Sequence, residues 1–221
     1  MPALFLLLLP ALTLSPDLSI AYQGEAGVEA RGLFTAGVLA GINPFVSFDA
    51  AVSFSLLPHS GLSGAAFRPE LTHPRLPGWK LDLGFQHQQW NDWQSAEDRL
   101  FFLLRCRPIR QLTLGLGVCR RLPFFTAGQR RQPLFPEWNL LYHLAWQLLN
   151  SNRLTVNAEL SNYDRLEIKN PQQLPGAIST AYRFTPDWKI ISRCQVGSNG
   201  LSTGLLSLTN LKMEIGVRYG K

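Results

Sequence analysis

The 221-residue chain has no apolar run long enough to be a transmembrane helix. A spanning helix needs about 20 consecutive apolar residues, and the run from Ala3 to Leu14 is too short. Hydrophobic residues make up 46% of the chain, which is too few for a helical membrane protein. A membrane barrel tolerates this composition, because the half of its side chains that faces the lumen is polar.

Cysteine is scarce, and nothing in its spacing indicates a metal centre. The three residues Cys106, Cys119 and Cys194 are far apart and form no C-x-x-C pair. An odd count excludes a fully paired disulfide framework. The net charge of +6 comes from basic residues spread along the chain, without a basic helix or an RNA-binding aromatic signature. We therefore expect no metal, no cofactor and no nucleic acid partner.

The chain is rich in strictly alternating segments, and residues 153–163 (R-L-T-V-N-A-E-L-S-N-Y) are the clearest. One face is apolar and carries Leu154, Val156, Ala158 and Leu160. The other face is polar and carries Arg153, Thr155, Asn157, Glu159 and Ser161. A period of two residues predicts a β-strand with one apolar and one polar face. No window outside the N-terminal run has a helical period, so the predicted fold is all-β.

Similar segments recur about twelve times, and the turns between them alternate in length. The predicted strands are 22–31, 35–42, 45–56, 64–71, 80–88, 99–107, 111–121, 139–149, 153–163, 177–184, 188–197 and a last strand ending at residue 219. Tight turns are predicted at 43–44, 73–78, 108–110, 150–152 and 185–187, with longer connections between them. This pattern predicts a closed antiparallel transmembrane β-barrel of about twelve strands, or about ten if Pro69 excludes strand 64–71.

The N-terminus predicts a secretory signal peptide over residues 1–21, followed by a barrel over residues 22–221. The apolar run has the length of a signal-peptide core, and Ser19-Ile20-Ala21 fits a small-x-small cleavage site. The alternative is a buried N-terminal strand or helix.

Two features favour lipid over a soluble core as the environment of the apolar faces. The polar faces of the first and last strands carry charges of both signs, a candidate lumen ion network between Glu25, Glu29 and Arg31 and the later Lys212, Glu214 and Arg218. Aromatic residues gather near strand ends, as in interfacial girdles: Tyr22, Trp79, Trp90, Trp138, Tyr163, Tyr182, Trp188 and Tyr219. A lipocalin-like or sandwich protein, with the apolar faces inside, is the alternative.

With these features the chain resembles small Gram-negative outer-membrane β-barrels, including porin-like ones. The resemblance implies localisation in the outer membrane, contact with lipopolysaccharide and dependence on the barrel-assembly machinery. Such barrels usually end in an aromatic residue, whereas this chain ends Arg218-Tyr219-Gly220-Lys221, with the aromatic two residues early.

The functional prediction rests on the polar faces, whose charged residues and one histidine are expected to line the lumen. They are Glu25, Glu29, Arg31, Asp49, Asp82, Arg105, Arg107, Arg121, His143, Arg153, Glu159, Lys189, Arg193, Lys212, Glu214 and Arg218. Basic residues outnumber acidic ones, so a narrow pore or transport barrel would favour small anionic solutes. If long side chains fill the lumen, the barrel is instead a non-conducting structural or surface-interaction protein.

A third hypothesis is a lipid-modifying barrel enzyme. The segment Val196-Gly197-Ser198-Asn199-Gly200 resembles the His-x-Ser-Asn segment of outer-membrane lipid A deacylases. Valine stands at the position of the base and cannot accept a proton, so we assign no catalytic residue and regard residues 198–200 as a turn. His143 is expected to form hydrogen bonds in the lumen. Arg130 and Arg131 are candidate ligands for lipopolysaccharide phosphate.

Overall fold

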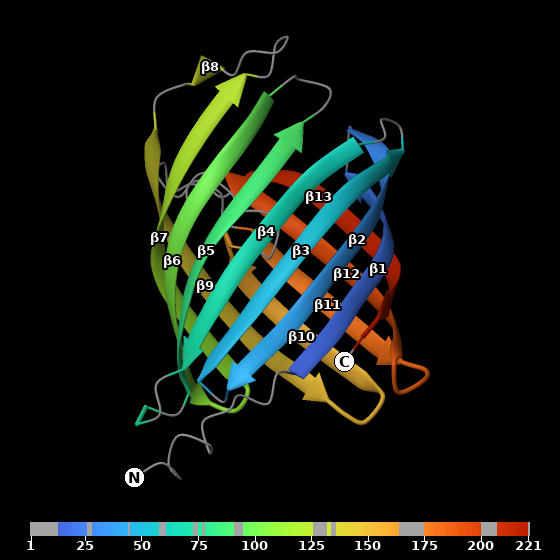
Figure 1. The fold of residues 1–221 in the computed structure, drawn as a ribbon. Helices are drawn as coiled ribbons and strands as arrows, with labels where there is room; N and C mark the ends of the chain where they lie inside the picture. Colours follow the sequence, from blue (N-terminus) through green and yellow to red (C-terminus); the bar gives the residue numbers. More distant parts are fainter. Residues whose placement is uncertain are drawn as a thin grey trace.

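A computed structural model describes residues 13–25, 28–43, 45–57, 61–72, 75–76, 78–90, 95–125, 132–133, 136–163, 175–199 and 207–220. Every regular element in these ranges is a β-strand (Figure 1). The strands are β1 (Thr13–Glu25), β2 (Val28–Asn43), β3 (Val46–Leu57), β4 (Gly61–Thr72), β5 (Trp79–Trp90), β6 (Ser95–Ile109), β7 (Leu112–Phe125), β8 (Gln132–Pro133), β9 (Glu137–Asn150), β10 (Leu154–Ser161), β11 (Gly176–Arg183), β12 (Trp188–Asn199) and β13 (Ser207–Tyr219). A search of the described residues for a helix long and apolar enough to cross a membrane found none.

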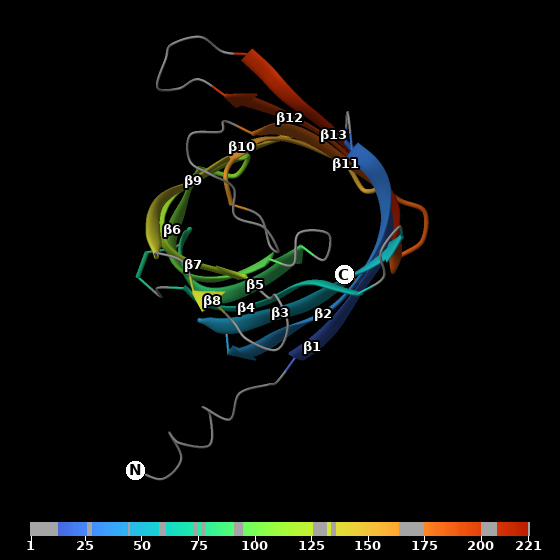
Figure 2. The same cartoon turned by 90° about the horizontal axis from the view of Figure 1, so that it is seen from above.

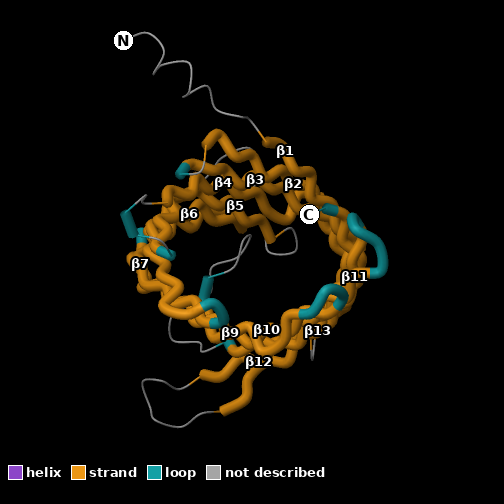
Figure 3. The backbone as a smooth tube through the Cα atoms, turned by 90° about the horizontal axis from the view of Figure 1, so that it is seen from below, coloured by secondary structure: helices purple, strands orange, loops and turns teal. Residues whose placement is uncertain are grey.

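Twelve of these strands close into one antiparallel barrel. Each strand pairs with its neighbours in the chain, and β7 pairs with both β6 and β9. The two-residue β8 pairs only with the end of β7. The seam joins β1 to β13, in register from Leu18 opposite Tyr219 to Glu25 opposite Lys212. The end views show the closed ring (Figures 2 and 3). The predicted fold class and strand number are confirmed.

The apolar faces point outward, away from the lumen. Leu116 on β7 and Ile215 on β13 are 61% and 59% exposed. The inward positions between them are polar or small on most strands, as Glu214 and Gly216 are on β13. A soluble fold would bury these large side chains, so the alternative with the apolar faces inside is wrong.

Short connections gather at one end of the barrel and most of the longer ones at the other (Figure 1). The short end carries the connections 44–45, 73–78, 110–111, 151–153 and 184–187, which confirm the predicted turns to within a few residues. The start of β1 and the end of β13 lie at this same end. Outer-membrane barrels place short turns on the periplasmic side and longer loops outside. We therefore call the two ends the periplasmic and the outer end.

The N-terminal strand departs from the sequence prediction. The predicted first strand, 22–31 with a turn at Gly32, is wrong: β1 ends at Glu25, and Gly32 lies within β2. Residues 13–21, assigned above to the signal peptide, pair with β2, and Leu18–Ala21 also pair with β13. Cleavage after Ala21 stays a prediction, and a chain cleaved there would retain only the last four residues of β1.

Several other strands extend beyond their predicted bounds, and two of them bear on specific predictions. The strand that contains Pro69 is present as β4. Arg68 and Pro69 do not pair with β5, but the register between β4 and β5 is the same on both sides of this gap. Proline has no N–H to donate to the ladder, which explains the local gap. The predicted turn at residues 198–200 is wrong for Ser198 and Asn199, because β12 continues through both and pairs with β13.

Candidate functional site in the barrel lumen

A ladder of ion pairs crosses the inner face of four neighbouring strands. Its members are Asp49 on β3, Arg68 and Glu70 on β4, Lys80 and Asp82 on β5, and Arg105 on β6. Arg68 donates from Nη2 to Asp49 Oδ2 at 2.8 Å. Arg105 donates from Nη2 to Glu70 at 2.6 Å and to Asp82 at 2.7 Å. Each carboxylate therefore has a cationic partner, and the ladder is close to electrically neutral.

A second ionic group lies on the same wall nearer the outer end. Glu97 and Arg99 on β6 are each 2% exposed. Arg99 Nε donates to Glu97 Oε1 at 2.7 Å, and Arg121 on β7 donates to both Glu97 oxygens. Gln88 accepts a further bond from Arg99 at 2.6 Å. Removing one partner from such a group would leave a buried charge uncompensated.

The facing wall carries a smaller group centred on Glu159 of β10. Arg193 on β12 lies 3.2 Å from one Glu159 oxygen, and His143 on β9 lies 3.4 Å from the other. The His143 ring also contacts Ser161 Oγ at 3.1 Å. His143 therefore contacts a hydroxyl and a carboxylate on the inner face of the barrel.

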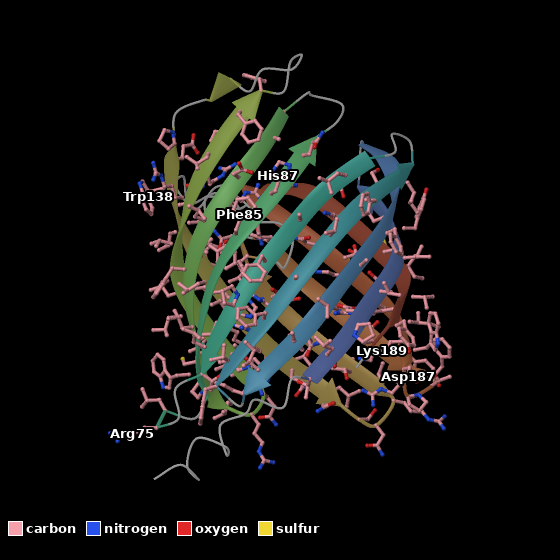
Figure 4. The ribbon with its side chains drawn as sticks, in the orientation of Figure 1. Arg75, Phe85, His87, Trp138, Asp187 and Lys189 are labelled. Atoms are coloured by element: carbon pink, nitrogen blue, oxygen red, sulfur yellow. The ribbon has the colours of Figure 1, made fainter. Side chains whose placement is uncertain are left out.

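At the periplasmic end, three basic residues lie side by side on consecutive strands. Arg183 on β11 is opposite Lys189 on β12, and Lys189 is opposite Arg218 on β13. Arg218 Nε donates to Asp17 Oδ1 at 2.7 Å. Within the described ranges, neither Arg183 nor Lys189 forms an ion pair, and Lys189 faces the like charges of the other two. We call Arg183, Lys189 and Arg218 the mouth cluster; Figure 4 shows Lys189 at this end of the barrel.

The chain turns inward where β10 ends, at Ser161, Asn162 and Tyr163. Asn162 accepts from the Tyr142 N–H at 2.8 Å and donates to the Leu140 carbonyl at 2.7 Å. Ser161 Oγ donates to the Tyr163 carbonyl at 2.8 Å. All three side chains are buried. The side-chain bonds replace the ladder that ends here and fix the direction of the turn.

Tyr163 reaches across the lumen from this turn. Its ring packs against Phe101 at a centroid distance of 5.2 Å, in an apolar cluster with Leu103, Cys119 and Leu141 on β6, β7 and β9. Its hydroxyl accepts from Arg68 Nη1 at 3.0 Å. In the order of strands around the barrel, β4 and β10 lie almost opposite each other. Tyr163 and Arg68 therefore join two facing walls, and we call this contact the lumen bridge.

The structure separates the sequence-predicted lumen residues into four sets. One set lies in the inner-face ion pairs and contacts described above: Asp49, Asp82, Arg105, Arg121, His143, Glu159, Lys189, Arg193 and Arg218. Lys212 and Glu214 lie on the inner face of β13, opposite Gln195 and Arg193. Arg107 is exposed near the periplasmic end of β6, and Arg153 is exposed in the turn before β10.

The fourth set consists of Glu25, Glu29 and Arg31, whose side chains lie outside the described residues. The backbone register places Glu25 opposite Lys212 and Arg31 opposite Gln23. Arg218 pairs with Asp17, a residue that the signal-peptide prediction removed from the barrel. Arg130 and Arg131 also lie outside the described residues.

Several functional residues were missed by the sequence reasoning. Arg68, Glu70 and Lys80 alternate with apolar neighbours, and this was the available signal. Glu97 and Arg99 flank the charged Asp98, so alternation does not mark them. Tyr163 was assigned to an interfacial girdle and is instead 5% exposed inside the lumen. Other girdle predictions agree with the structure, since Tyr22, Trp79, Trp138, Tyr182 and Trp188 are each at least 41% exposed.

The deacylase-like segment lies at the outer end of β12, and only part of it is described. Val196 lies within β12, opposite Gly176 and Leu211, and the side chains of Ser198 and Asn199 are outside the described residues. Cys106, Cys119 and Cys194 are free thiols. Among the described residues, no group of three or more His, Cys, Asp or Glu side chains is placed to hold a metal ion.

Comparison with known proteins gives structural matches only, since no protein-family model and no curated protein sequence matches the chain. The chain resembles the KdgM porin in complex with disordered oligogalacturonate, with a TM-score of 0.54 and 13% identity over 92% of this chain and 98% of that one. It also resembles an outer-membrane channel from Pseudomonas putida F1, with a TM-score of 0.56 and 8% identity over 94% and 95% of the two chains.

A third similar structure is outer membrane phospholipase A from Escherichia coli, with a TM-score of 0.51 and 11% identity over 92% of this chain and 89% of that one. At these identities the likeness shows the fold, an outer-membrane-type barrel. The same fold carries pores and an enzyme, so function has to be argued from the residues of this chain.

Proposed function

We propose that the protein is a passive outer-membrane pore that favours small anionic solutes. The mouth cluster is the observation that carries the proposal. Like charges on directly opposed strand positions destabilise a sheet, and Arg183, Lys189 and Arg218 occupy three such positions in a row. An anion passing the periplasmic mouth would offset this repulsion.

The lining beside the mouth cluster supports a path for solutes. The inner face of β11 and the adjoining parts of β13 and β1 carry small side chains: Ala177, Ser179, Ala181, Gly216, Ser19 and Ala21. Between them, β12 contributes the larger Ile191 and Arg193. The ladder wall and the lumen bridge occupy the other side of the lumen. A solute path along β11–β13 would therefore meet the mouth cluster directly.

Carboxylated sugars are the first solutes to test. The KdgM porin, a structure with the same fold, was solved with oligogalacturonate, a carboxylated oligosaccharide. Guanidinium and ammonium groups bind carboxylates through charge-assisted hydrogen bonds. Weak binding at the mouth would concentrate such a solute without preventing its release.

Ion selectivity in planar lipid bilayers tests the proposal. The wild-type protein should show a reversal potential favouring chloride over potassium in a salt gradient. Replacing both Arg183 and Lys189 by Gln should lower the anion preference, because the remaining Arg218 is paired with Asp17. Arg110→Gln, in the exposed β6–β7 turn, is the matched control and should leave selectivity unchanged. Equal selectivity of the double variant and the wild type would contradict the proposal.

A non-conducting structural barrel is the second candidate, and the lumen bridge favours it. Tyr163 joins facing walls, and Asp82 and Gln86 beneath it are fully buried. Side chains that fill a barrel of this size leave a plug rather than a channel. Folded protein that inserts into bilayers without any channel events would establish this second function and exclude the first.

A further inference from the structure

On the described strands, charged and imidazole side chains on the outward face of the barrel are confined to one group of three residues. On the strands that the structure describes, an imidazole, carboxylate or guanidinium occupies an outward position at His87 on β5, Asp98 on β6 and Arg120 on β7. These strands are consecutive, and all three residues lie toward their outer ends. The remaining outward positions are apolar, aromatic or uncharged. A group confined to one place on a lipid-facing surface calls for a specific explanation.

The position of Arg120 along the membrane normal can be inferred from its neighbours on β6 and β9. Arg120 lies opposite Leu100 on one side and Trp138 on the other. Trp138 is 69% exposed and begins the outward apolar series of β9, which ends at Leu148. This series matches the roughly 9–11 residues with which a strand crosses a bilayer. Arg120 and Trp138 therefore lie at the outer membrane boundary; Figure 4 shows Trp138 on the outer surface, far from the periplasmic end.

The three charged groups differ in how they are engaged. His87 Nδ1 contacts Asp98 Oδ1 at 2.7 Å, and Phe124 lies against the His87 ring at a centroid distance of 6.2 Å. Both side chains of this pair are largely buried. Arg120 is exposed, and its guanidinium lies 6.0 Å from the centroid of the Trp138 ring. No carboxylate in the described ranges forms an ion pair with Arg120, so its donors face the membrane boundary.

We propose that Arg120 and Trp138 bind a phosphate of a phosphorylated glycolipid of the outer leaflet, the lipid A part of lipopolysaccharide. A guanidinium matches phosphate with two parallel hydrogen bonds, and a tryptophan ring sits at the level of lipid headgroups. The cost of an outward arginine falls to about 0–1 kcal/mol near the interface. The site is on the outer surface and uses no lumen residue, so it is independent of pore activity.

Native mass spectrometry of the detergent-solubilised protein tests this site. The wild type, Arg120→Gln, Arg120→Lys and Arg153→Gln are each titrated with bisphosphorylated lipid A and with dephosphorylated lipid A. Arg153 is an exposed arginine at the periplasmic end and gives the same charge change as a control. Heat-modifiable migration on a gel confirms that each variant is folded. Inorganic phosphate is added in a parallel titration to compare a free anion with the lipid.

We expect Arg120→Gln to weaken binding of phosphorylated lipid A about tenfold, the loss typical of one charge-assisted contact. Arg120→Lys should fall between Arg120→Gln and the wild type, because lysine keeps the charge but loses the paired donors. Arg153→Gln should bind as the wild type does, and removing the phosphates should reduce wild-type binding to the Arg120→Gln level. Equal binding by Arg120→Gln and the wild type, or no effect of the lipid phosphates, would overturn the proposal. Displacement of lipid A by equimolar inorganic phosphate would also overturn it, because a free anion would then be the ligand.

Discussion

In the lumen bridge, the contributions of the Tyr163 hydroxyl and of its ring can be tested separately by two substitutions. Tyr163→Phe removes the acceptor of the 3.0 Å bond from Arg68 and keeps the ring against Phe101. Arg68 retains its contact with Asp49 at 2.8 Å. Leaving one buried donor unsatisfied costs about 1–3 kcal/mol. We expect Tyr163→Phe to lower the free energy of unfolding at the small end of this range and to leave conductance nearly unchanged.

Tyr163→Ala removes the ring as well. Tyr163 is 5% exposed and packs in the cluster with Phe101, Leu103, Cys119 and Leu141. Truncating a buried aromatic residue to alanine costs about 3–5 kcal/mol, part of it from the cavity left behind. Because the deleted side chain crosses the lumen, we expect single-channel conductance to rise together with this loss of stability.

Urea unfolding in detergent micelles, followed by the loss of the fast-migrating unboiled form on a gel, measures the stability change. Bilayer recording of the same preparations measures conductance. Tyr182→Ala is the matched control, since Tyr182 is an outward residue of β11 and 42% exposed. Its substitution should cost less stability and should not alter conductance.

Two outcomes for Tyr163→Ala would contradict different parts of this prediction. If Tyr163→Ala and Tyr182→Ala lower stability equally and neither changes conductance, the Tyr163 ring is not a packed element of the lumen. If Tyr163→Ala lowers stability by the expected amount in a barrel that never conducts, the packing stands and the pore proposal fails. The stability and conductance results therefore report on separate claims.

Two further predictions concern the ladder and the seam. Arg105→Leu leaves the fully buried Asp82 without its partner and should lower the free energy of unfolding by about 3–5 kcal/mol in the same urea assay, whereas Asp187→Asn, in an exposed turn, should change it by less than about 0.5 kcal/mol. Gly216→Ala would place a Cβ 2.8 Å from the Ala21 Cα and should reduce the yield of folded barrel. Normal folding of this variant, together with a mature protein whose N-terminal peptide begins at Tyr22 in tandem mass spectrometry, would instead support cleavage after Ala21.

Alternation in the sequence was sufficient to predict the barrel. A period of two residues assigns each side chain of a strand either to the lipid-facing side or to the lumen. The faces of the barrel can therefore be read directly from the sequence, and the turns lie where the alternation breaks. The same pattern continues into β1, where Leu14, Leu18 and Ile20 alternate with Ser15 and Asp17. Because residues 1–21 were assigned to a signal peptide, the prediction did not include residues 13–21 in the first strand.

The contacts in the lumen could not be predicted, because they depend on register and on a reversal of the chain. Asp49 and Arg68 become partners only when β3 and β4 are aligned to the residue. Tyr163 has the parity of the polar face of its segment, but its place at the strand end led to the girdle prediction. The turn fixed by Asn162, from which the ring reaches across the lumen, could not be predicted from the sequence. One signal was available for the apolar cluster: residues 101–104 are apolar in succession, which predicts apolar side chains on both faces.

The distribution of charge in the lumen matters more for function than its sum. In the ladder and around Glu97, the inner-face basic residues lie against carboxylates at hydrogen-bond distance, as Arg105 does against Asp82 and Glu70. A neutral pair produces little field beyond the Debye length of about 8 Å at physiological salt. The mouth cluster differs, because Arg183 and Lys189 lie beside a further cation and share one nearby carboxylate. Substitutions in the ladder should therefore change stability, and substitutions in the mouth cluster should change selectivity.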